Sequence, residues 1–170
     1  MMLINNEENI KSLKTSIAEK ILIGLGMFSL CLFISASITT YLELHGFAQA
    51  QFISLIIVAP MVEEAVKLWA VYAQKNPYIV TGVFAGSEVY YVMLQYSALG
   101  FNIVRMIGIR IISVLMHMIT LMIQKYFKDK FSTVQMSLLG YIIAVLIHAA
   151  FNFFMLLSNT KLIAWLSESF

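Results

Sequence analysis

Long apolar runs separated by short polar stretches form the dominant pattern of this chain. A helix that crosses a bilayer needs about 20 mostly apolar residues. Runs that meet this need cover 21–41, 50–72, 78–96, 103–123 and 134–157. The stretches between the later runs carry turn-forming or charged residues: Asn76-Pro77, Gly100 with Asn102, and Lys128-Asp129-Lys130. The pattern therefore predicts an all-α, polytopic membrane helix bundle with about five transmembrane helices.

The distribution of lysine and arginine predicts how this bundle is oriented. The segments before the first run and after the second and fourth together carry seven lysines, three, one and three, whereas the alternate segments carry at most two basic residues. Cytoplasmic loops carry the excess of positive charge, so we expect a multi-pass protein of the cell membrane with its N-terminus in the cytoplasm and its C-terminus outside. We expect a tail over 1–20, one transmembrane domain over 21–157 and a short tail over 158–170. The first run has the basic flank of a signal peptide, but its length favours a membrane span.

Composition agrees with a membrane protein. The 170 residues are 61% hydrophobic and 12% charged, whereas soluble domains carry about 25% charged residues. The formal net charge of +2 is too small to suggest nucleic acid as a partner, and the lipid bilayer is the expected surrounding. Cys31 is the single cysteine, which excludes an intramolecular disulfide, and we interpret it as a packing residue.

Several ionisable side chains interrupt the apolar runs. A charge at the centre of a membrane helix costs about 2.5–3.5 kcal/mol. Such residues must therefore pair, change protonation state or line water, and they mark candidate functional sites. They are Glu63, Glu64, Lys67, Glu88, Arg110, His117 and His148.

Helical spacing brings these residues onto shared faces. In the run E-E-x-x-K, Lys67 projects between Glu63 and Glu64, one turn further along. Pro60 lacks the N–H that would reach the carbonyl of Ile56, which leaves that carbonyl free on the same face. Similar polar stripes follow in the later runs, and they consist of Glu88, Tyr91 and Gln95; of Arg110, Ser113, His117, Thr120 and Gln124; and of His148 and Asn152.

Adjacent carboxylates beside imidazoles suit hydrolysis by activated water. Glu63 and Glu64 should titrate as one coupled pair that can take a proton from water and return it to a leaving group. His117, His148 and Asn152 supply donors that could stabilise an oxyanion. This chemistry fits cleavage of a peptide bond and requires no cofactor.

A metal site is the alternative interpretation of the same residues. Two histidines and a carboxylate can hold a hydrolytic zinc ion with one open position. The ligands would be Glu88, His117 and His148, with Glu64 able to stand in for Glu88. The ligands would be dispersed, because the chain has no H-E-x-x-H motif.

Four motifs in order resemble those of the PrsW-type intramembrane proteases. They are Glu63-Glu64-x-x-Lys67, a Gly- and Phe-rich run over 82–91 that carries Glu88 and Tyr91, Arg110 with His117 two turns later, and His148-x-x-x-Asn152. The related CAAX prenyl protease and bacteriocin-processing group has E-E-x-x-x-R, and Leu68 stands here in place of that arginine.

The resemblance implies an endopeptidase embedded in the membrane that cleaves membrane-tethered proteins or peptides, of which anti-sigma factors are one type. It implies catalytic roles for Glu63, Glu64, Glu88, His117 and His148. We add Asn152 as an oxyanion donor, with Lys67, Arg110 and Tyr91 as supporting residues. The family does not decide between glutamate-activated water and a metal.

Two other classes of function would use the same buried charges. A transporter or proton channel is one, although such proteins usually contain repeats and discontinuous paired helices, which this sequence lacks. A non-catalytic scaffold or immunity protein of the same fold is the other. The sequence sets neither the substrate nor the oligomeric state.

Overall fold

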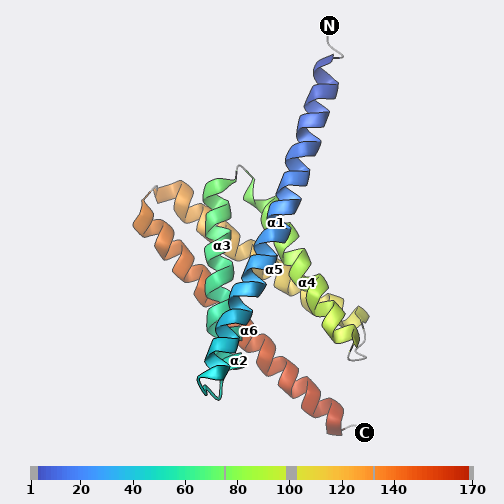
Figure 1. Ribbon diagram of the computed structural model, residues 1–170, viewed down its shortest axis with the longest axis vertical. Helices are drawn as coiled ribbons and strands as arrows, with labels where there is room; N and C mark the ends of the chain where they lie inside the picture. The colour runs from blue at the N-terminus through green and yellow to red at the C-terminus, as the bar shows by residue number, and fades with distance from the viewer. Residues whose placement is uncertain (1–3, 75, 99–102, 132, 169–170) are drawn as a thin grey trace.

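The chain folds into helices joined by short connections (Figure 1). The computed structural model describes residues 4–74, 76–98, 103–131 and 133–168. The elements within them are α1 (Ile4–Leu44), α2 (Ala50–Ile53), a π-helical turn η1 (Ser54–Val58), α3 (Ala59–Ala73), α4 (Pro77–Ala98), α5 (Ile103–Phe131) and α6 (Val134–Glu168). No strand occurs among the described residues, so the predicted all-α class is confirmed.

Helix boundaries agree with the apolar runs in part. The connection at Asn76-Pro77 is confirmed, since α3 ends at Ala73 and Pro77 opens α4, where a missing N–H costs nothing. The first and last helices continue through the expected tails, because α1 begins at Ile4 and α6 ends at Glu168. Gly100 and Asn102 lie outside the described residues.

The turn predicted at Lys128-Asp129-Lys130 was wrong. These residues belong to α5, which ends at Phe131. Lysines in the last turn favour the helix because they oppose the negative end of its dipole. Lys128 also donates a hydrogen bond of 2.7 Å to the carbonyl of Val71 near the end of α3. Lys128 therefore links the ends of α5 and α3 instead of ending a helix.

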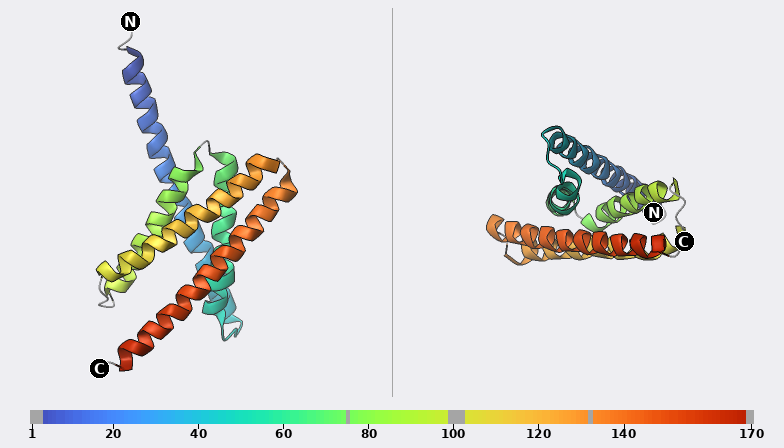
Figure 2. Two further views of the ribbon diagram at one scale, coloured as in Figure 1. Left: turned by 180° about the vertical axis from the view of Figure 1, so that it is seen from behind. Right: turned by 90° about the horizontal axis from the view of Figure 1, so that it is seen from below.

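Helix α3 lies at the centre of the bundle, where it contacts α1, α4, α5 and α6. Helices α5 and α6 run antiparallel side by side and form one layer (Figure 2). Helices α1, α3 and α4 all lie on one side of this layer (Figure 2). The N-terminal part of α1 extends beyond the bundle (Figure 1). Four helices thus surround α3, which carries the E-E-x-x-K run.

Burial in this bundle is the reverse of that in a soluble domain. The fully buried side chains include Glu64, Lys67 and His117, each 0% exposed, whereas Phe33 is 72% and Leu22 69% exposed. A small apolar core does form between α1, α3 and α4, from Met27, Cys31, Ala70, Val80 and Phe84. Cys31 therefore packs as predicted. The polar groups face inward and many large apolar groups face outward.

Within the described residues, two segments are long and apolar enough to cross a membrane. They are Ser16–Leu44 of α1 and Val134–Ser158 of α6. Each corresponds to one of the predicted spans, the first and the last. Length and composition thus support membrane association for these two helices.

Candidate active site

Helix α3 presents its two neighbouring glutamates to different surroundings. Consecutive residues of a helix point about 100° apart. Glu64 faces the bundle interior and is 0% exposed, whereas the Glu63 side chain is 15% exposed and lines a cavity. The two carboxylates that sequence treated as one pair therefore have different surroundings, although each lies beside one nitrogen of His148.

Glu64 is the centre of a buried polar network. Its Oε1 accepts a hydrogen bond of 2.8 Å from His148 Nδ1 and an ion-pair contact from Lys67. Its Oε2 accepts a hydrogen bond of 2.8 Å from Gln124 Nε2. Both oxygens are thus occupied by donors on α3, α5 and α6, which ties these three helices together. Burying a carboxylate is tolerable when it is paired and hydrogen-bonded in this way.

Lys67 has an acceptor for each of its three N–H groups. Besides Glu64, its Nζ donates to His117 Nδ1 over 3.1 Å and to Thr120 Oγ1 over 2.9 Å. An ammonium group carries three donors and no acceptor, so this set satisfies it completely. Helical spacing predicted that Lys67 would lie between the two glutamates. In the structure its ammonium group contacts Glu64.

The bond from Lys67 decides which nitrogen of His117 carries the proton. Because Nδ1 accepts from Lys67, the hydrogen of a neutral ring must be on Nε2. That Nε2 contacts the Glu88 carboxylate of α4, and a carboxylate accepts such a hydrogen. His117 therefore presents an N–H, not a lone pair, toward Glu88.

His148 has the opposite arrangement. Its Nδ1–H donates to Glu64, which leaves the lone pair of Nε2 directed away from the network. Glu63 Oε2 lies 3.7 Å from this Nε2, too far for a direct hydrogen bond. Among the described residues, Glu63 Oε2 has no hydrogen-bond partner. The rings of His148 and His117 meet edge to face, with centroids 5.1 Å apart.

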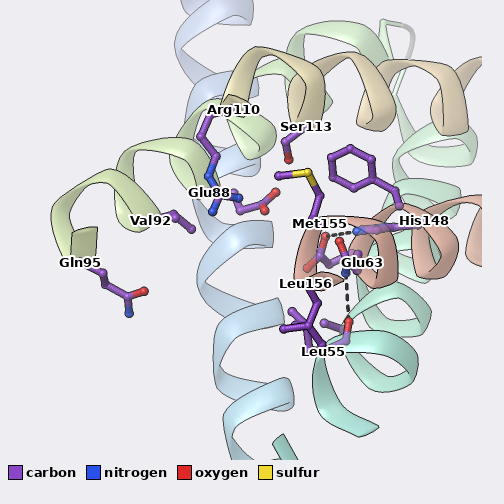
Figure 3. Close-up of a pocket in the computed structure, with 13 residues that line it drawn as sticks. Leu55, Glu63, Glu88, Val92, Gln95, Arg110, Ser113, His148, Met155 and Leu156 are labelled. Atoms are coloured by element: carbon purple, nitrogen blue, oxygen red, sulfur yellow. Dashed lines mark hydrogen bonds and ion pairs between the residues drawn. The ribbon is translucent and has the colours of Figure 1, made fainter. Parts of the chain in front are cut away.

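A cavity of about 270 Å³ opens in front of this cluster. Figure 3 shows Glu63, Glu88, Arg110 and His148 around it, with Gln95 further along α4. Apolar side chains complete the walls, among them Leu55, Val92, Phe151, Met155 and Leu156. The cavity is large enough for several water molecules or a short piece of chain. Glu64, Lys67 and His117 are not among its lining residues and lie behind it.

Asn152 lines the cavity, but its amide is already engaged. Its Nδ2 donates a hydrogen bond of 3.0 Å to the backbone carbonyl of Leu55. In η1 the N–H of Ala59 bonds to the carbonyl of Ser54, five residues back. In this register the N–H that Pro60 lacks would have reached the carbonyl of Leu55, which is the carbonyl that Asn152 bonds. The Asn152 amide carries a second N–H, so its expected role as an oxyanion donor stays a prediction.

Two of the supporting residues lie in different places. Arg110 lines the cavity near Glu88, as its position in the polar stripe predicted (Figure 3). Tyr91 is not in the cavity: its ring is 39% exposed and packs against Phe28 of α1, with centroids 6.0 Å apart. The spacing from Glu88 to Tyr91 turns the tyrosine about 60° off the line of Glu88, and this is enough to direct it to another helix.

The residues that could hold a metal ion differ from the predicted set. Ligand atoms of Glu63, His117 and His148 lie within 4.8 Å of one another, with Glu63 in the place expected for Glu88. A histidine ligand needs a free lone pair on the coordinating nitrogen. His148 Nε2 offers one, but His117 Nε2 carries the hydrogen that faces Glu88. The hydrogen bonds of His117 therefore do not fit a metal at this position.

Sequence reasoning placed Thr120 and Gln124 on a polar stripe but gave them no role. The structure places both in the network, where they bond to Lys67 and Glu64. The available signal was the spacing of these two polar residues, four apart in an otherwise apolar run, and the structure buries both completely. The apolar cavity walls at Val92, Met155 and Leu156 carry no comparable signal, because they resemble any other residue in an apolar helix.

Comparison of the chain with models of protein families, with curated proteins and with solved structures finds no match. The function is therefore argued from the chemistry of the site.

Proposed function

We propose that this protein is an intramembrane endopeptidase of the PrsW type, which hydrolyses peptide bonds of membrane-tethered proteins with glutamate-activated water. The observation that carries the proposal is the position of Glu63. Its Oε2 has no hydrogen-bond partner among the described residues and is buried beside the cavity that the Glu63 side chain lines, 3.7 Å from His148 Nε2. A water molecule beside both atoms could give up a proton, and such acid–base assistance typically accelerates a reaction by about 100- to 10,000-fold.

The reaction proceeds by addition and elimination. Glu63 takes one proton from the water while the water oxygen attacks the carbonyl carbon of the scissile peptide bond. A tetrahedral intermediate forms with its negative charge on the former carbonyl oxygen. The proton then passes from Glu63 to the leaving nitrogen, and the C–N bond breaks. Glu64 does not touch the substrate; it holds the His148 ring in the orientation that leaves Nε2 free.

Groups across the cavity supply positive potential for the intermediate. Arg110 lines the wall near Glu88, and the Nε2–H of His117 points toward the same carboxylate. Donors and charges fixed before reaction stabilise a developing oxyanion without the cost of reorganising water. We assign this role to Arg110, because His117 lies behind the wall and its Nε2–H is already engaged by the Glu88 carboxylate.

We also propose that the bundle spans the membrane about five times, as the apolar runs indicate. The exposed large apolar side chains support this, since a soluble monomer rarely exposes contiguous apolar patches of more than a few hundred Å². They occur on all the long helices, with Leu22, Trp69, Leu94, Leu115 and Leu146 as examples. A lipid bilayer is the solvent that such a surface fits.

The cavity opens toward one end of the bundle. It reaches Gln95 near the end of α4, Arg110 early in α5 and Leu156 late in α6. Lys125, Lys128 and Lys130 lie at the opposite end of α5. Positive loops stay in the cytoplasm, so we place the open end, and the bond that is cut, in the outer half of the membrane.

The test is cleavage by purified protein in liposomes that contain a mixture of single-span peptides. Mass spectrometry would detect new peptide ends. We expect new ends with the unaltered protein and none with Glu63→Gln, which keeps the shape but cannot accept the proton. Glu43→Gln is the matched control, because Glu43 is an exposed glutamate outside the cavity, and it should cleave normally. Equal cleavage by Glu63→Gln would reject the proposal.

A chelator separates water activation by protein from activation by a metal. Because His117 offers an N–H and not a lone pair, we expect 1,10-phenanthroline to leave the cleavage rate unchanged. The control is a zinc protease in the same liposomes, which the chelator should inhibit. Loss of cleavage that added zinc restores would support the metal interpretation instead.

A further inference from the structure

The chain enters α3 through a backbone defect that needs a donor from elsewhere. In η1 each N–H reaches five residues back, as Ala59 does to the carbonyl of Ser54. The next donor in this register would be residue 60, and its acceptor would be Leu55. Pro60 has no N–H, and it is fully buried. Without a substitute, the carbonyl of Leu55 would lose its hydrogen-bond partner within the protein.

Asn152 supplies the substitute. Its Nδ2 lies 3.0 Å from the Leu55 carbonyl oxygen and donates to it. Asn152 lies one turn after His148 on α6. Helix α6 therefore carries both the histidine that lines the cavity and the amide that bonds to the chain just before α3. A side-chain amide is suited to this task because it offers two N–H groups.

The π-turn affects which side chains of η1 and α3 face the cavity. Leu55, Ala59 and Glu63 succeed one another at intervals of four residues and all line it. A regular α-helix would rotate each of them about 40° from the last, whereas the wider π-turn reduces this drift. Loss of the π-turn would therefore change the direction of the cavity wall relative to Glu63.

We infer that Asn152 is a positioning residue, which replaces the N–H missing from Pro60 and so fixes the π-turn that aims Glu63 into the cavity. Its effect on cleavage rests on the proposed function, but its effect on the backbone does not. An oxyanion donor at Asn152 would act on the substrate and would be independent of Pro60. The two roles therefore differ in how they respond to a change at Pro60.

The experiment compares Asn152→Ala, Pro60→Ala and the double variant in detergent and in liposomes. We expect Asn152→Ala to unfold at a lower temperature, to speed amide hydrogen exchange at Ala59 and to lower cleavage on the order of 100-fold, as small misplacements of a catalytic group can do. Pro60→Ala returns an N–H to the backbone. The double variant should therefore recover unfolding temperature, slow exchange and most of the cleavage.

Asn152→Asp gives a second test that does not depend on the double variant. An ionised aspartate has the size of asparagine but no donor, so exchange at Ala59 should be as fast as in Asn152→Ala. Normal exchange at Ala59 in both single variants, or a cleavage loss that Pro60→Ala leaves unchanged, would overturn the inference and favour an oxyanion donor. If the unaltered protein cleaves nothing, the proposed function fails, while unfolding and exchange still decide the role of Asn152.

Discussion

At the scale of single residues, adjacent glutamates have different tasks. Glu64 satisfies donors from Lys67, Gln124 and His148 and has no exposed surface. Glu63 lines the cavity, and its Oε2 is buried without a hydrogen-bond partner among the described residues. The difference arises because neighbours on a helix point about 100° apart, so Glu64 faces the interior between three helices and Glu63 faces the cavity side.

This division predicts that the two glutamate-to-glutamine substitutions lower the stability of the protein by different amounts. Glu64→Gln removes the charge that pairs with the buried Lys67, and breaking a buried pair on one side costs about 3–5 kcal/mol. We expect Glu64→Gln to unfold at a much lower temperature than the unaltered protein. Glu63→Gln should unfold almost normally, because Glu63 has no lysine or arginine ion pair among the described contacts. Thermal unfolding in detergent measures both, and equal losses would contradict the separate roles.

Residue spacing predicted part of this site. The E-E-x-x-K pattern placed Lys67 one turn from Glu64, and the structure brings them into contact. Contacts between residues of different helices could not be predicted in the same way, because they depend on how each helix is rotated about its axis. Tyr91 illustrates this: it follows the spacing of its polar stripe, yet its ring packs on Phe28 outside the cavity.

At the scale of helices, close contacts depend on glycine at particular positions. A Cβ built at Gly24 of α1 would lie 2.8 Å from the Val80 carbonyl oxygen and 2.8 Å from the Val83 Cβ, both on α4. Such distances are too short for real contacts, and one of the neighbours is backbone. A Cβ at Gly26 would meet nothing within 4 Å. The two glycines therefore differ although they lie on the same helix.

Alanine at these glycines should have effects of opposite sign. Gly24→Ala forces α1 and α4 apart, and such overpacking typically costs about 1–3 kcal/mol. Gly26→Ala adds a methyl group in open space and gains helix propensity, worth up to about 1 kcal/mol. We expect the unfolding temperature to fall for Gly24→Ala and to stay or rise for Gly26→Ala. A fall of the same size in both variants would contradict the close contact of α1 with α4.

The helices themselves were largely predictable, and their defects were not. Apolar runs of 20 or so residues predict helices because a membrane leaves no other way to pair the backbone. The run over 50–72 gave no sign that it divides into α2, η1 and α3. Pro60 indicated a carbonyl without a backbone donor, but neither the π-turn nor the hydrogen bond from Asn152 to Leu55, 97 residues away along the chain, could be predicted from the sequence.

At the scale of the whole molecule, the two ends of the bundle differ in their charge and in their distance from the cavity. One end carries Lys125, Lys128 and Lys130 at the end of α5, where Lys128 also lies over the Tyr72 ring at 4.9 Å. The other end holds the α1–α2 turn, where Gly46 adopts a φ of 77°, and the mouth of the cavity. In the proposed orientation, a substrate would reach the site from the second end.

Thiol labelling in intact cells tests this orientation. With Cys31 replaced by alanine, a cysteine introduced at Glu43, an exposed residue beside the α1–α2 turn, should react with an impermeant maleimide added outside. A cysteine introduced at Lys130, exposed near the end of α5, should react only after the membrane is permeabilised. The reverse pattern would place the cavity mouth in the cytoplasmic half. Reaction of both from outside would contradict a bundle that crosses the membrane between these positions. Because Glu63 lies on α3 between the two ends, the pattern also assigns the side from which a peptide bond reaches it.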